Sequence, residues 1–373
     1  MVGASIQSSA NPPAYTKPAD LVQMSTRVCL HVGSYRSRGG EGLYALHLDA
    51  DRFSRGGVYS DAQDASWTVQ SASTGLVYMV EEAKVGRIGV HRFNGSGWHR
   101  MACVATDGAL PCYLALDRAE RKLAVANYGS GSIAVFDIGE DGLPAGPALV
   151  HQHTGSGPVR DRQASAHAHC AVFAPDGRLY HVDLGSDQIL RYSMRADGTL
   201  DQPTVQFAAP AGSGPRHLLF HPRRPLAVLV SELASTLTIF DLTERGLRER
   251  QHLSTLPPRF AGDNLGGHLE INRTGNRIYV SNRGHDSIAV FAWADAGDCA
   301  PVQHISSEGA SPRHFRLLNS ERLLAVANEE SDNVVLLHVG TDGSLASTGR
   351  QVAVPGAACV FAVQVGRSND VAA

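Results

Sequence analysis

The stretch "LAVANYGSGSIAVFDIGEDG" at residues 123–142 has the same layout as "LAVANEESDNVVLLHVGTDG" at residues 324–343. Each has an apolar run, a short polar turn, a second run that is largely apolar, and a closing Asp-Gly. This layout is typical of a β-hairpin that ends in a further turn. Looser copies occur at residues 28–53, 77–97, 179–198, 227–246 and 278–297. The chain is therefore built from a repeated β unit.

Further strand-like segments flank the hairpins and complete a unit of four strands. For example, "HAHCAVF" at residues 167–173 precedes one hairpin, and "TVQFAAP" at residues 204–210 follows it. Four strands that recur roughly every 40–50 residues are typical of a propeller blade. The leading strands begin near Thr68, Tyr113, His169, Arg216, His268, Arg313 and Cys359.

The two ends of this array complete each other. The hairpin at residues 28–53 lacks a leading strand, whereas "AACVFAV" at residues 357–363 is a leading strand without a hairpin. The sequence therefore predicts an all-β, seven-bladed β-propeller whose ring closes by pairing of the C-terminal strand with the first blade. An open solenoid is the structural alternative, but the mutually incomplete ends argue against it. We expect one propeller domain at residues 27–365, a flexible leader at residues 1–26, with Met24 as an alternative start, and a tail at residues 366–373.

Composition and charge exclude several classes of partner. A formal net charge of −3 over 373 residues predicts neither a nucleic-acid partner nor binding to an anionic membrane surface. No apolar run is long enough to span a membrane, and the N-terminal residues lack the pattern of a secretory signal, so we expect a cytoplasmic protein. The six cysteines form no CxxC pair, which favours buried free thiols in a reducing compartment.

Blade geometry brings two columns of residues to one mouth of the central channel. The leading strand lines the channel, and the second strand runs antiparallel to it, so the start of one lies beside the end of the other. The fifth position of each hairpin unit holds polar residues suited to pinning a turn, namely Ser34, Glu81, Asn127, Asp183, Ser231, Asn282 and Asn328. The sixth position holds residues of very different type, and folding alone does not require this variety. They are Tyr35, Glu82, Tyr128, Leu184, Glu232, Arg283 and Glu329. The leading strands add Tyr113, His169, Arg216, His268 and Arg313, with His167, His217 and His314 nearby.

Charged groups on the inner strands of a compact domain are costly unless they are paired or solvated. One interpretation is a set of structural ion pairs that join the blades. The other is a site for a small anionic ligand, equipped with acid–base groups.

Several segments resemble the seven-bladed lactonase family, which includes propeller-type bacterial 6-phosphogluconolactonases and fungal carboxymuconate lactonizing enzymes. They are "HAHCAVFAPDG" at 167–177, "GSGPRHLLFHP" at 212–222, "SELASTLTIFDL" at 231–242, "IYVSNRGHDSIAVF" at 278–291 and the region around "LAVANEESDNVVLL" at 324–337. The resemblance extends over about residues 28–365. It implies chemistry at His169, Arg216, Glu232 and Arg283. It departs at Gly267-His268-Leu269-Glu270, where relatives often have a small residue followed by Glu-Ile-His, although His268 and Glu270 are still expected to share one face of the strand.

Lactone hydrolysis needs charge to stabilise an oxyanion, a base for water and a proton for the leaving alkoxide. We assign His169 and Glu232 to proton transfer, leaving open which is the base, and Arg216 and Arg283 to binding of the anion and the oxyanion. The residues expected to bind substrate are Arg313, His268, Tyr128, His167 and Glu270.

The predicted substrate is a small anionic lactone, with a sugar phosphate preferred, and no metal or other cofactor is required. A metal shared by His167, His169 and His268 is a weaker alternative. A lactonizing isomerase and a non-catalytic propeller scaffold are the alternative functions. The polar insertion at residues 151–166 is either a lid over the mouth or a loose loop.

Overall fold

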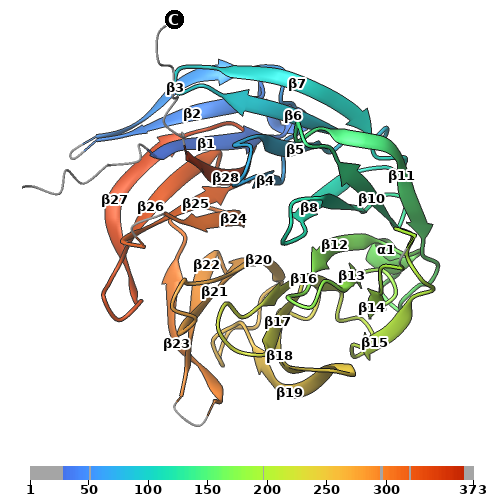
Figure 1. Ribbon diagram of the computed structural model, residues 1–373. Helices are drawn as coiled ribbons and strands as arrows, with labels where there is room; N and C mark the ends of the chain where they lie inside the picture. Colours follow the sequence, from blue (N-terminus) through green and yellow to red (C-terminus); the bar gives the residue numbers. More distant parts are fainter. Residues whose placement is uncertain (1–27, 50–51, 196, 295–296, 319–320, 365–373) are drawn as a thin grey trace, which may run out of the picture.

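The structure, a computed structural model, describes residues 28–49, 52–195, 197–294, 297–318 and 321–364. Seven four-stranded antiparallel sheets stand side by side in a ring (Figure 1). The prediction of an all-β, seven-bladed propeller is therefore confirmed. The expected leader at 1–26 and tail at 366–373 lie outside the described residues.

The first blade contains both the first and the last described strands. Its strand order is β28-β1-β2-β3, and β28 pairs antiparallel to β1 with Phe361 opposite His31. The C-terminal strand is thus the inner strand of this blade, as its sequence indicated. The bounds of the four strands are β28 Ala357–Gln364, β1 Val28–Ser34, β2 Leu43–Leu48 and β3 Phe53–Tyr59.

The other six blades follow chain order, with the leading strand always innermost (Figure 1). Blade 2 has β4 Thr68–Gln70, β5 Val77–Glu81, β6 Arg87–Phe93 and β7 Trp98–Ala105. Blade 3 has β8 Pro111–Leu116, β9 Lys122–Asn127, β10 Ser132–Ile138 and β11 Pro144–Gln152. Blade 4 has β12 Ala168–Phe173, β13 Leu179–Asp183, β14 Gln188–Tyr192 and β15 Thr204–Ala208.

The second half of the ring repeats the plan. Blade 5 has β16 Pro215–Phe220, β17 Leu226–Ser231, β18 Thr236–Thr243 and β19 Gly246–Ser254. Blade 6 has β20 Leu265–Ile271, β21 Arg277–Arg283, β22 Ser287–Trp293 and β23 Cys299–Ser306. Blade 7 has β24 Pro312–Leu317, β25 Leu323–Asn328, β26 Asn333–Val339 and β27 Leu345–Ala353. Within the described ranges, two short helices interrupt the strands, η1 Arg36–Arg38 and α1 Arg160–Gln163.

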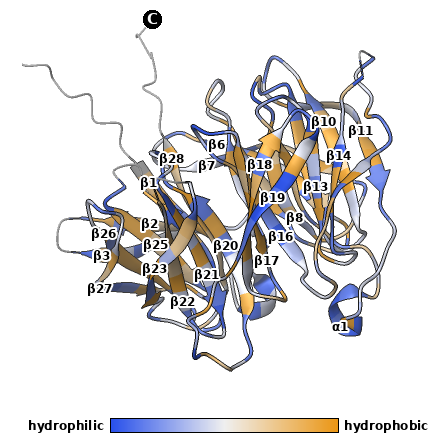
Figure 2. Cartoon of the chain, turned by 90° about the horizontal axis from the view of Figure 1, so that it is seen from below, coloured by the Kyte–Doolittle hydropathy of each residue, from blue (hydrophilic) through white to orange (hydrophobic). Residues whose placement is uncertain are grey.

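The core lies between the faces of neighbouring blades. Every residue of β17 is buried, whereas the outer strand β19 exposes most of its polar side chains. Apolar colour accordingly follows the strands in Figure 2. Two buried tyrosines also join blades by hydrogen bonds: Tyr279 donates its hydroxyl to the oxygen of Gly343 at 2.9 Å, and Tyr78 donates to that of Gly142 at 2.6 Å.

Amides in the fifth position of the repeat hold the turns at the mouth of the channel. Asn282 donates from Nδ2 to the backbone oxygen of Thr255 at 2.9 Å, and Asn328 donates to that of Ser307 at 3.1 Å. Both amides are fully buried. The turn-pinning interpretation of this column is confirmed for these positions.

A β-bulge near the mouth decides which side chains enter the channel. In β12, Ala168 lies opposite Asp183 and Cys170 lies opposite Val182, so His169 has no partner residue. The same irregularity leaves Arg216 unpaired in β16 and Arg313 unpaired in β24. A bulge re-aims the side chain of its extra residue, and here it presents these three residues at the mouth.

The bulges correct the predicted leading column at two positions. In β8 the extra residue is Cys112, so Tyr113 is paired and lies one step further along the channel. In β20 the irregularity runs from Gly266 to Leu269, and His268 likewise lies one step deeper. Tyr113 and His268 therefore belong to a second layer, because the bulge begins at the equivalent point in all five strands and these two residues follow its extra residue, as Cys170, His217 and His314 do in β12, β16 and β24.

Four of the six cysteines, Cys112, Cys170, Cys299 and Cys359, are buried, and all six are free. Cys103 departs from the expected burial because it lies exposed on the outer strand β7.

Among the described residues, no helix has the length and apolarity that a membrane span requires.

Candidate active site

The centre of the candidate site is the carboxylate of Glu232, which directly follows β17 and is 2% exposed. Its Oε2 accepts a hydrogen bond from Arg216 Nε at 2.9 Å and lies 2.8 Å from Arg283 Nη2. Arg162 Nη2 donates to the other oxygen, Oε1. Blade 5, blade 6 and α1 thus each contribute one guanidinium group to a single buried carboxylate.

His169 completes this cluster from blade 4. Its Nε2 lies 3.6 Å from Glu232 Oε2, and the residue is 5% exposed. Burial, followed by the positive charge of Arg216, lowers the pKa of His169 well below its usual range. The imidazole is therefore neutral near pH 7, and its contact with Glu232 is not an ion pair in that state.

Electrostatics keep Glu232 ionised in spite of its burial. Burial alone raises the pKa of this carboxyl, but Arg283 and Arg216 outweigh it and hold the pKa well below the usual range. Burial and the nearby charge of Arg283 lower the pKa of Arg216 to about 10. The cluster therefore has one negative and three positive charges near neutral pH, which leaves two positive charges in excess.

Tyr128 and His167 lie beside the cluster at the rim of the mouth. Their rings stack with centroids 4.5 Å apart, and His167 Nδ1 donates to the backbone oxygen of Tyr128 at 2.9 Å. The Tyr128 hydroxyl accepts a hydrogen bond from Arg162 Nη2 at 3.3 Å. Tyr128 and His167, two of the residues expected to bind substrate, are thus near the four central residues.

Arg313 lies at the same mouth but in a separate charge cluster. Its Nη2 lies 3.7 Å from Glu82 Oε2, and its Nη1 lies 3.5 Å from Glu329 Oε2. Its guanidinium carbon also lies 5.0 Å from the ring centroid of Tyr35. Because two carboxylates already balance its charge, Arg313 is less suited to holding a phosphate than its sequence position indicated.

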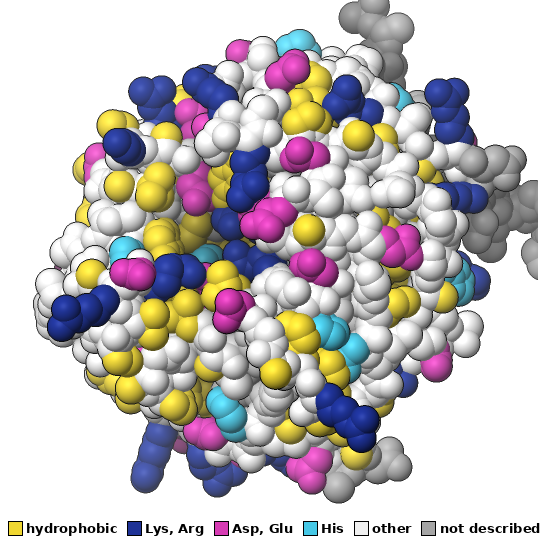
Figure 3. Space-filling view, turned by 180° about the vertical axis from the view of Figure 1, so that it is seen from behind, with side chains coloured by type: hydrophobic (Ala, Val, Ile, Leu, Met, Phe, Trp, Pro, Cys, Tyr) yellow, Lys and Arg dark blue, Asp and Glu magenta, His cyan; other side chains and the backbone are white. Residues whose placement is uncertain are grey.

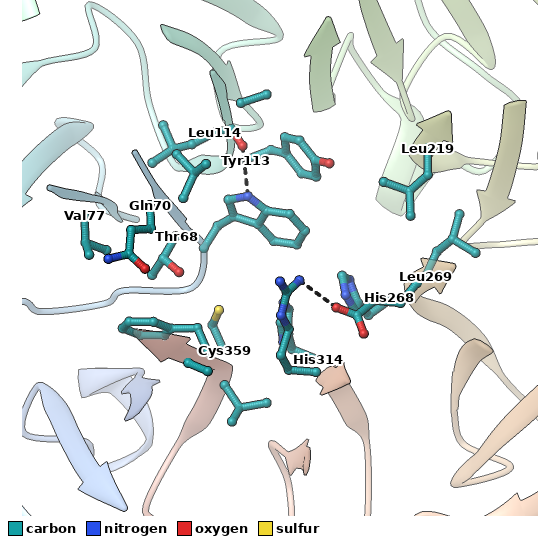
Figure 4. A pocket seen from close by; sticks show the side chains of 18 of the residues that line it. Thr68, Gln70, Val77, Tyr113, Leu114, Leu219, His268, Leu269, His314 and Cys359 are labelled. Carbon is teal, nitrogen blue, oxygen red and sulfur yellow. Dashed lines mark hydrogen bonds and ion pairs between the residues drawn. The ribbon is translucent and has the colours of Figure 1, made fainter. Parts of the chain in front are cut away.

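A ring of aromatic side chains narrows the channel below the mouth. The indole of Trp67 donates from Nε1 to the oxygen of Leu114 at 3.0 Å and stacks on Tyr113 with centroids 4.1 Å apart. Three histidines surround the same indole, with centroids at 5.1 Å for His217, 5.4 Å for His268 and 5.3 Å for His314. Beyond this ring lies a cavity of about 420 Å³, and Figure 4 shows Tyr113, His268 and His314 among the residues that line it.

The structure does not bring His268 and Glu270 to the Glu232 cluster. His268 stacks on His314 in the second layer, with centroids 4.0 Å apart. Glu270 lies further along β20, where it accepts hydrogen bonds from Arg316 Nη1 at 2.8 Å and from the backbone N–H of Leu317 at 2.7 Å. Gly266 at the mouth pairs with Asn282 and Glu270 pairs with Tyr279, three steps further along β21, or about 10 Å.

The surface agrees with this charge distribution. Figure 2 shows α1 projecting from one end of the ring, and Figure 3 views the molecule from that side. Lys and Arg side chains gather in and beside a central hollow there, with Asp and Glu around it (Figure 3). In the part of the chain that the structure describes, no group of three or more His, Cys, Asp or Glu side chains is placed to hold a metal ion.

Comparison with known proteins identifies the family. The family model described as "Lactonase, 7-bladed beta-propeller" matches residues 29–362. The chain belongs to the seven-bladed lactonase family. A relative named 6-phosphogluconolactonase, from Bacillus subtilis, is 33% identical to this lactonase-family chain over 346 residues, which cover 90% of this chain and 98% of that protein.

Solved structures of proteins from other bacteria share this fold. The structure of a periplasmic gluconolactonase from Pseudomonas aeruginosa matches with a TM-score of 0.82 at 29% identity, covering 91% of this chain and 99% of that one. A protein from Lactobacillus plantarum matches with a TM-score of 0.83 at 32% identity, covering 90% of this chain and 98% of that one.

Two features of this lactonase-family site were not among the residues proposed from sequence. Arg162 lies in the insertion at residues 151–166, and the only signal for it was the long interval between the leading strands of blades 3 and 4. Trp67 directly precedes β4 and had no signal, because a single aromatic residue at the start of a strand is usually part of the core.

Proposed function

We propose that this protein hydrolyses a small anionic sugar lactone, with 6-phosphogluconolactone as the leading candidate. The observation that carries the proposal is the cluster in which Arg162, Arg216 and Arg283 share the single carboxylate of Glu232. Two excess positive charges in a site of low solvent exposure favour an anion, and a phosphate group suits them best. The name of the Bacillus subtilis relative supports the same substrate.

An available lone pair favours His169 over Glu232 as the general base. A base must be unprotonated at working pH and must have a lone pair that can reach the attacking water. Both oxygens of Glu232 are already bound by guanidinium groups, which lower its pKa and weaken it as a base. His169 is neutral, and Glu232 Oε2 lies 3.6 Å from its Nε2, where it stabilises the imidazolium once a proton has been taken up.

The proposed reaction then runs in two steps. His169 accepts a proton from water while the water oxygen attacks the lactone carbonyl carbon, and the carbonyl oxygen becomes an oxyanion. Arg216 and Arg283 stabilise this oxyanion with fixed positive charge. The ring C–O bond then breaks, the carbonyl reforms, and the imidazolium of His169 returns the proton to the leaving alkoxide. The product is the open-chain hydroxy acid.

The test is hydrolysis of 6-phosphogluconolactone and of the unphosphorylated gluconolactone by purified protein, corrected for spontaneous hydrolysis. We expect turnover of the phosphorylated lactone, and a decrease in kcat/KM of about 10²–10⁴-fold in His169→Asn, as is typical for loss of an acid–base group. His99→Asn, at an exposed position in β7, is the matched control and is expected to retain full activity. Wild-type protein that hydrolyses neither lactone would refute the proposal.

The lactonizing alternative is tested in the same preparation by adding carboxymuconate and following its ultraviolet absorbance. Conversion of carboxymuconate without hydrolysis of either sugar lactone would replace the proposed reaction by cyclisation.

A cytoplasmic location remains part of the proposal, and the six free cysteines are consistent with a reducing compartment.

A further inference from the structure

Arg162 differs from the other groups around Glu232 in its exposure. Its side chain is 32% exposed, whereas those of Arg283 and Arg216 are 10% and 4% exposed. The side chain of His169 is 7% exposed. Within this cluster, solvent therefore reaches the buried carboxylate most readily on the side of Arg162, and a substrate that enters from the mouth meets this guanidinium group first.

The helix that carries Arg162 is fixed by a different residue. Gln163 is fully buried and donates from Nε2 to the backbone oxygen of Leu184 at 2.9 Å. Its Oε1 accepts from the backbone N–H of Val159 at 3.2 Å, and its own backbone oxygen accepts from Gly157 at 2.9 Å. The insertion is thus anchored over the mouth rather than loose, and its anchor does not depend on Arg162.

The charge of Arg162 is surplus to the needs of Glu232. Arg216 and Arg283 already bind Glu232 Oε2 at 2.9 Å and 2.8 Å, so the single negative charge has two partners without Arg162. Arg313 shows the opposite arrangement, because it lies near two carboxylates. Of these arginines, Arg162 is the most accessible to solvent, and it shares its one carboxylate with two other guanidinium groups.

The spacing of the guanidinium groups fits a substrate with a phosphate at one end and, at the other, a carbonyl oxygen that becomes negative during the reaction. Arg162 and Arg216 bind opposite oxygens of one carboxylate. Two hydrogen bonds and the width of a carboxylate separate such groups by on the order of 8 Å. A six-carbon sugar lactone with a terminal phosphate has a comparable distance between its carbonyl group and its phosphate.

We propose that Arg162 binds the phosphomonoester group of the substrate, and that the insertion at residues 151–166 thereby gives the protein its preference for phosphorylated over unphosphorylated sugar lactones. This inference rests on the proposed lactonase function and names the residue that selects the substrate. The hydroxyl of Tyr128, which accepts from Arg162 Nη2 at 3.3 Å, orients the guanidinium group toward the mouth.

The test compares Arg162→Gln, Arg162→Lys and the control Arg160→Gln, which alters an exposed arginine of the same helix. In Arg162→Gln we expect kcat/KM for 6-phosphogluconolactone to decrease about 10- to 100-fold, mainly through KM, because one charge-assisted hydrogen-bond donor is lost. The value for gluconolactone should decrease far less, Arg162→Lys should be intermediate for the phosphorylated lactone, and Arg160→Gln should match wild type for both. An equal decrease for both lactones, or no decrease, would overturn the inference.

A binding experiment separates failure of this inference from failure of the proposed function. Titration calorimetry with the hydrolysis products, 6-phosphogluconate and gluconate, requires no turnover. Tighter binding of 6-phosphogluconate that is lost in Arg162→Gln supports the role of Arg162 even if neither lactone is hydrolysed. Equal affinity for the two acids in wild type, or an unchanged ratio in Arg162→Gln, contradicts it even if the protein proves to be a lactonase.

Discussion

Glu232 acts on its surroundings mainly through its charge. Its carboxylate holds Arg216 and Arg283, which arise from different blades, in one place at the mouth of the channel. Without it, two largely buried guanidinium groups would repel each other, as the effect of Arg283 on the pKa of Arg216 indicates. The structural and the chemical interpretations of these charges therefore apply together, because the ion pairs that join the blades also form the anion site.

Replacing Glu232 by Gln should consequently reduce both activity and stability. Loss of one partner from a buried ion pair typically costs about 3–5 kcal/mol, and we expect a decrease of that order in the free energy of unfolding, measured with guanidinium chloride. The double variant Glu232→Gln/Arg283→Gln should recover part of the loss because it also removes an unpaired charge. Glu249→Gln, exposed on β19, is the control and should stay within about 0.5 kcal/mol of wild type. A single variant as stable as wild type would show that the pairing of Glu232 is not structural.

If His169 is the general base, the acid limb of the pH–activity profile should lie at unusually low pH. Burial and Arg216 lower the pKa of this imidazole, so the neutral, active form should persist below pH 6.5. Activity, measured as kcat/KM for a lactone across pH 4–9, should fall only as the pH drops through this lowered value. Arg216→Gln removes one cause of the shift and should move the limb toward the usual histidine range. A limb at or above pH 6.5 in wild type would rule out His169 as the base.

At the level of strands, the sequence predicts which elements meet but not their local register. The repeat correctly places the starts of the leading strands beside the ends of the second strands, and His169, Arg216, Glu232 and Arg283 come together as expected. The bulges that present His169, Arg216 and Arg313 at the mouth are not visible in a pattern of apolar residues, and without them the predicted column took Tyr113 and His268 instead of the residue before each.

The inner strand β28 is the element on which closure of the ring depends. It supplies pairing for β1 and buried apolar side chains such as Val360 and Val363, which belong to two different core clusters. Deletion of residues 357–373 should therefore abolish the cooperative thermal transition followed by circular dichroism, because blade 1 loses its inner strand. Deletion of residues 366–373 alone is the control and should preserve the transition. Cooperative unfolding of the longer deletion would show that the ring is stable without closure.

For the molecule as a whole, the repeats allow the architecture to be predicted from the sequence. The insertions do not follow the repeat, and their structure cannot be predicted in the same way. The number of blades and the closure of the ring follow from a pattern repeated throughout the chain, so errors at single positions do not change them. Arg162 occurs in a segment that no other repeat contains, and Trp67 occupies the axis of the ring, where no periodicity applies. These two positions depend on contacts between distant parts of the chain, which only three-dimensional coordinates provide.

The buried histidines predict how the whole molecule responds to acid. Burial lowers the pKa of His31 and of His91 to about 4, and burial also lowers the pKa of the channel histidines His217, His268 and His314. The unfolded chain, with histidine pKa values near 6.5, then takes up protons before the folded protein does. The stabilisation is complete above pH 6.5 and is lost as the pH falls toward the folded-state values.

For His31 or His91 alone, a shift of this size corresponds to roughly 3 kcal/mol. The midpoint of guanidinium chloride unfolding should therefore fall steeply between pH 6.5 and 4.5, beyond the effect of carboxylates alone. His31→Phe keeps an aromatic ring beside Phe93 and Trp98 but cannot titrate. The decrease of the unfolding midpoint with falling pH should therefore be smaller in this variant, by the contribution of one histidine. The control His99→Gln, at an exposed position, should leave the slope unchanged. A wild-type midpoint that is constant from pH 8 to 5 would contradict the neutral state of these buried imidazoles.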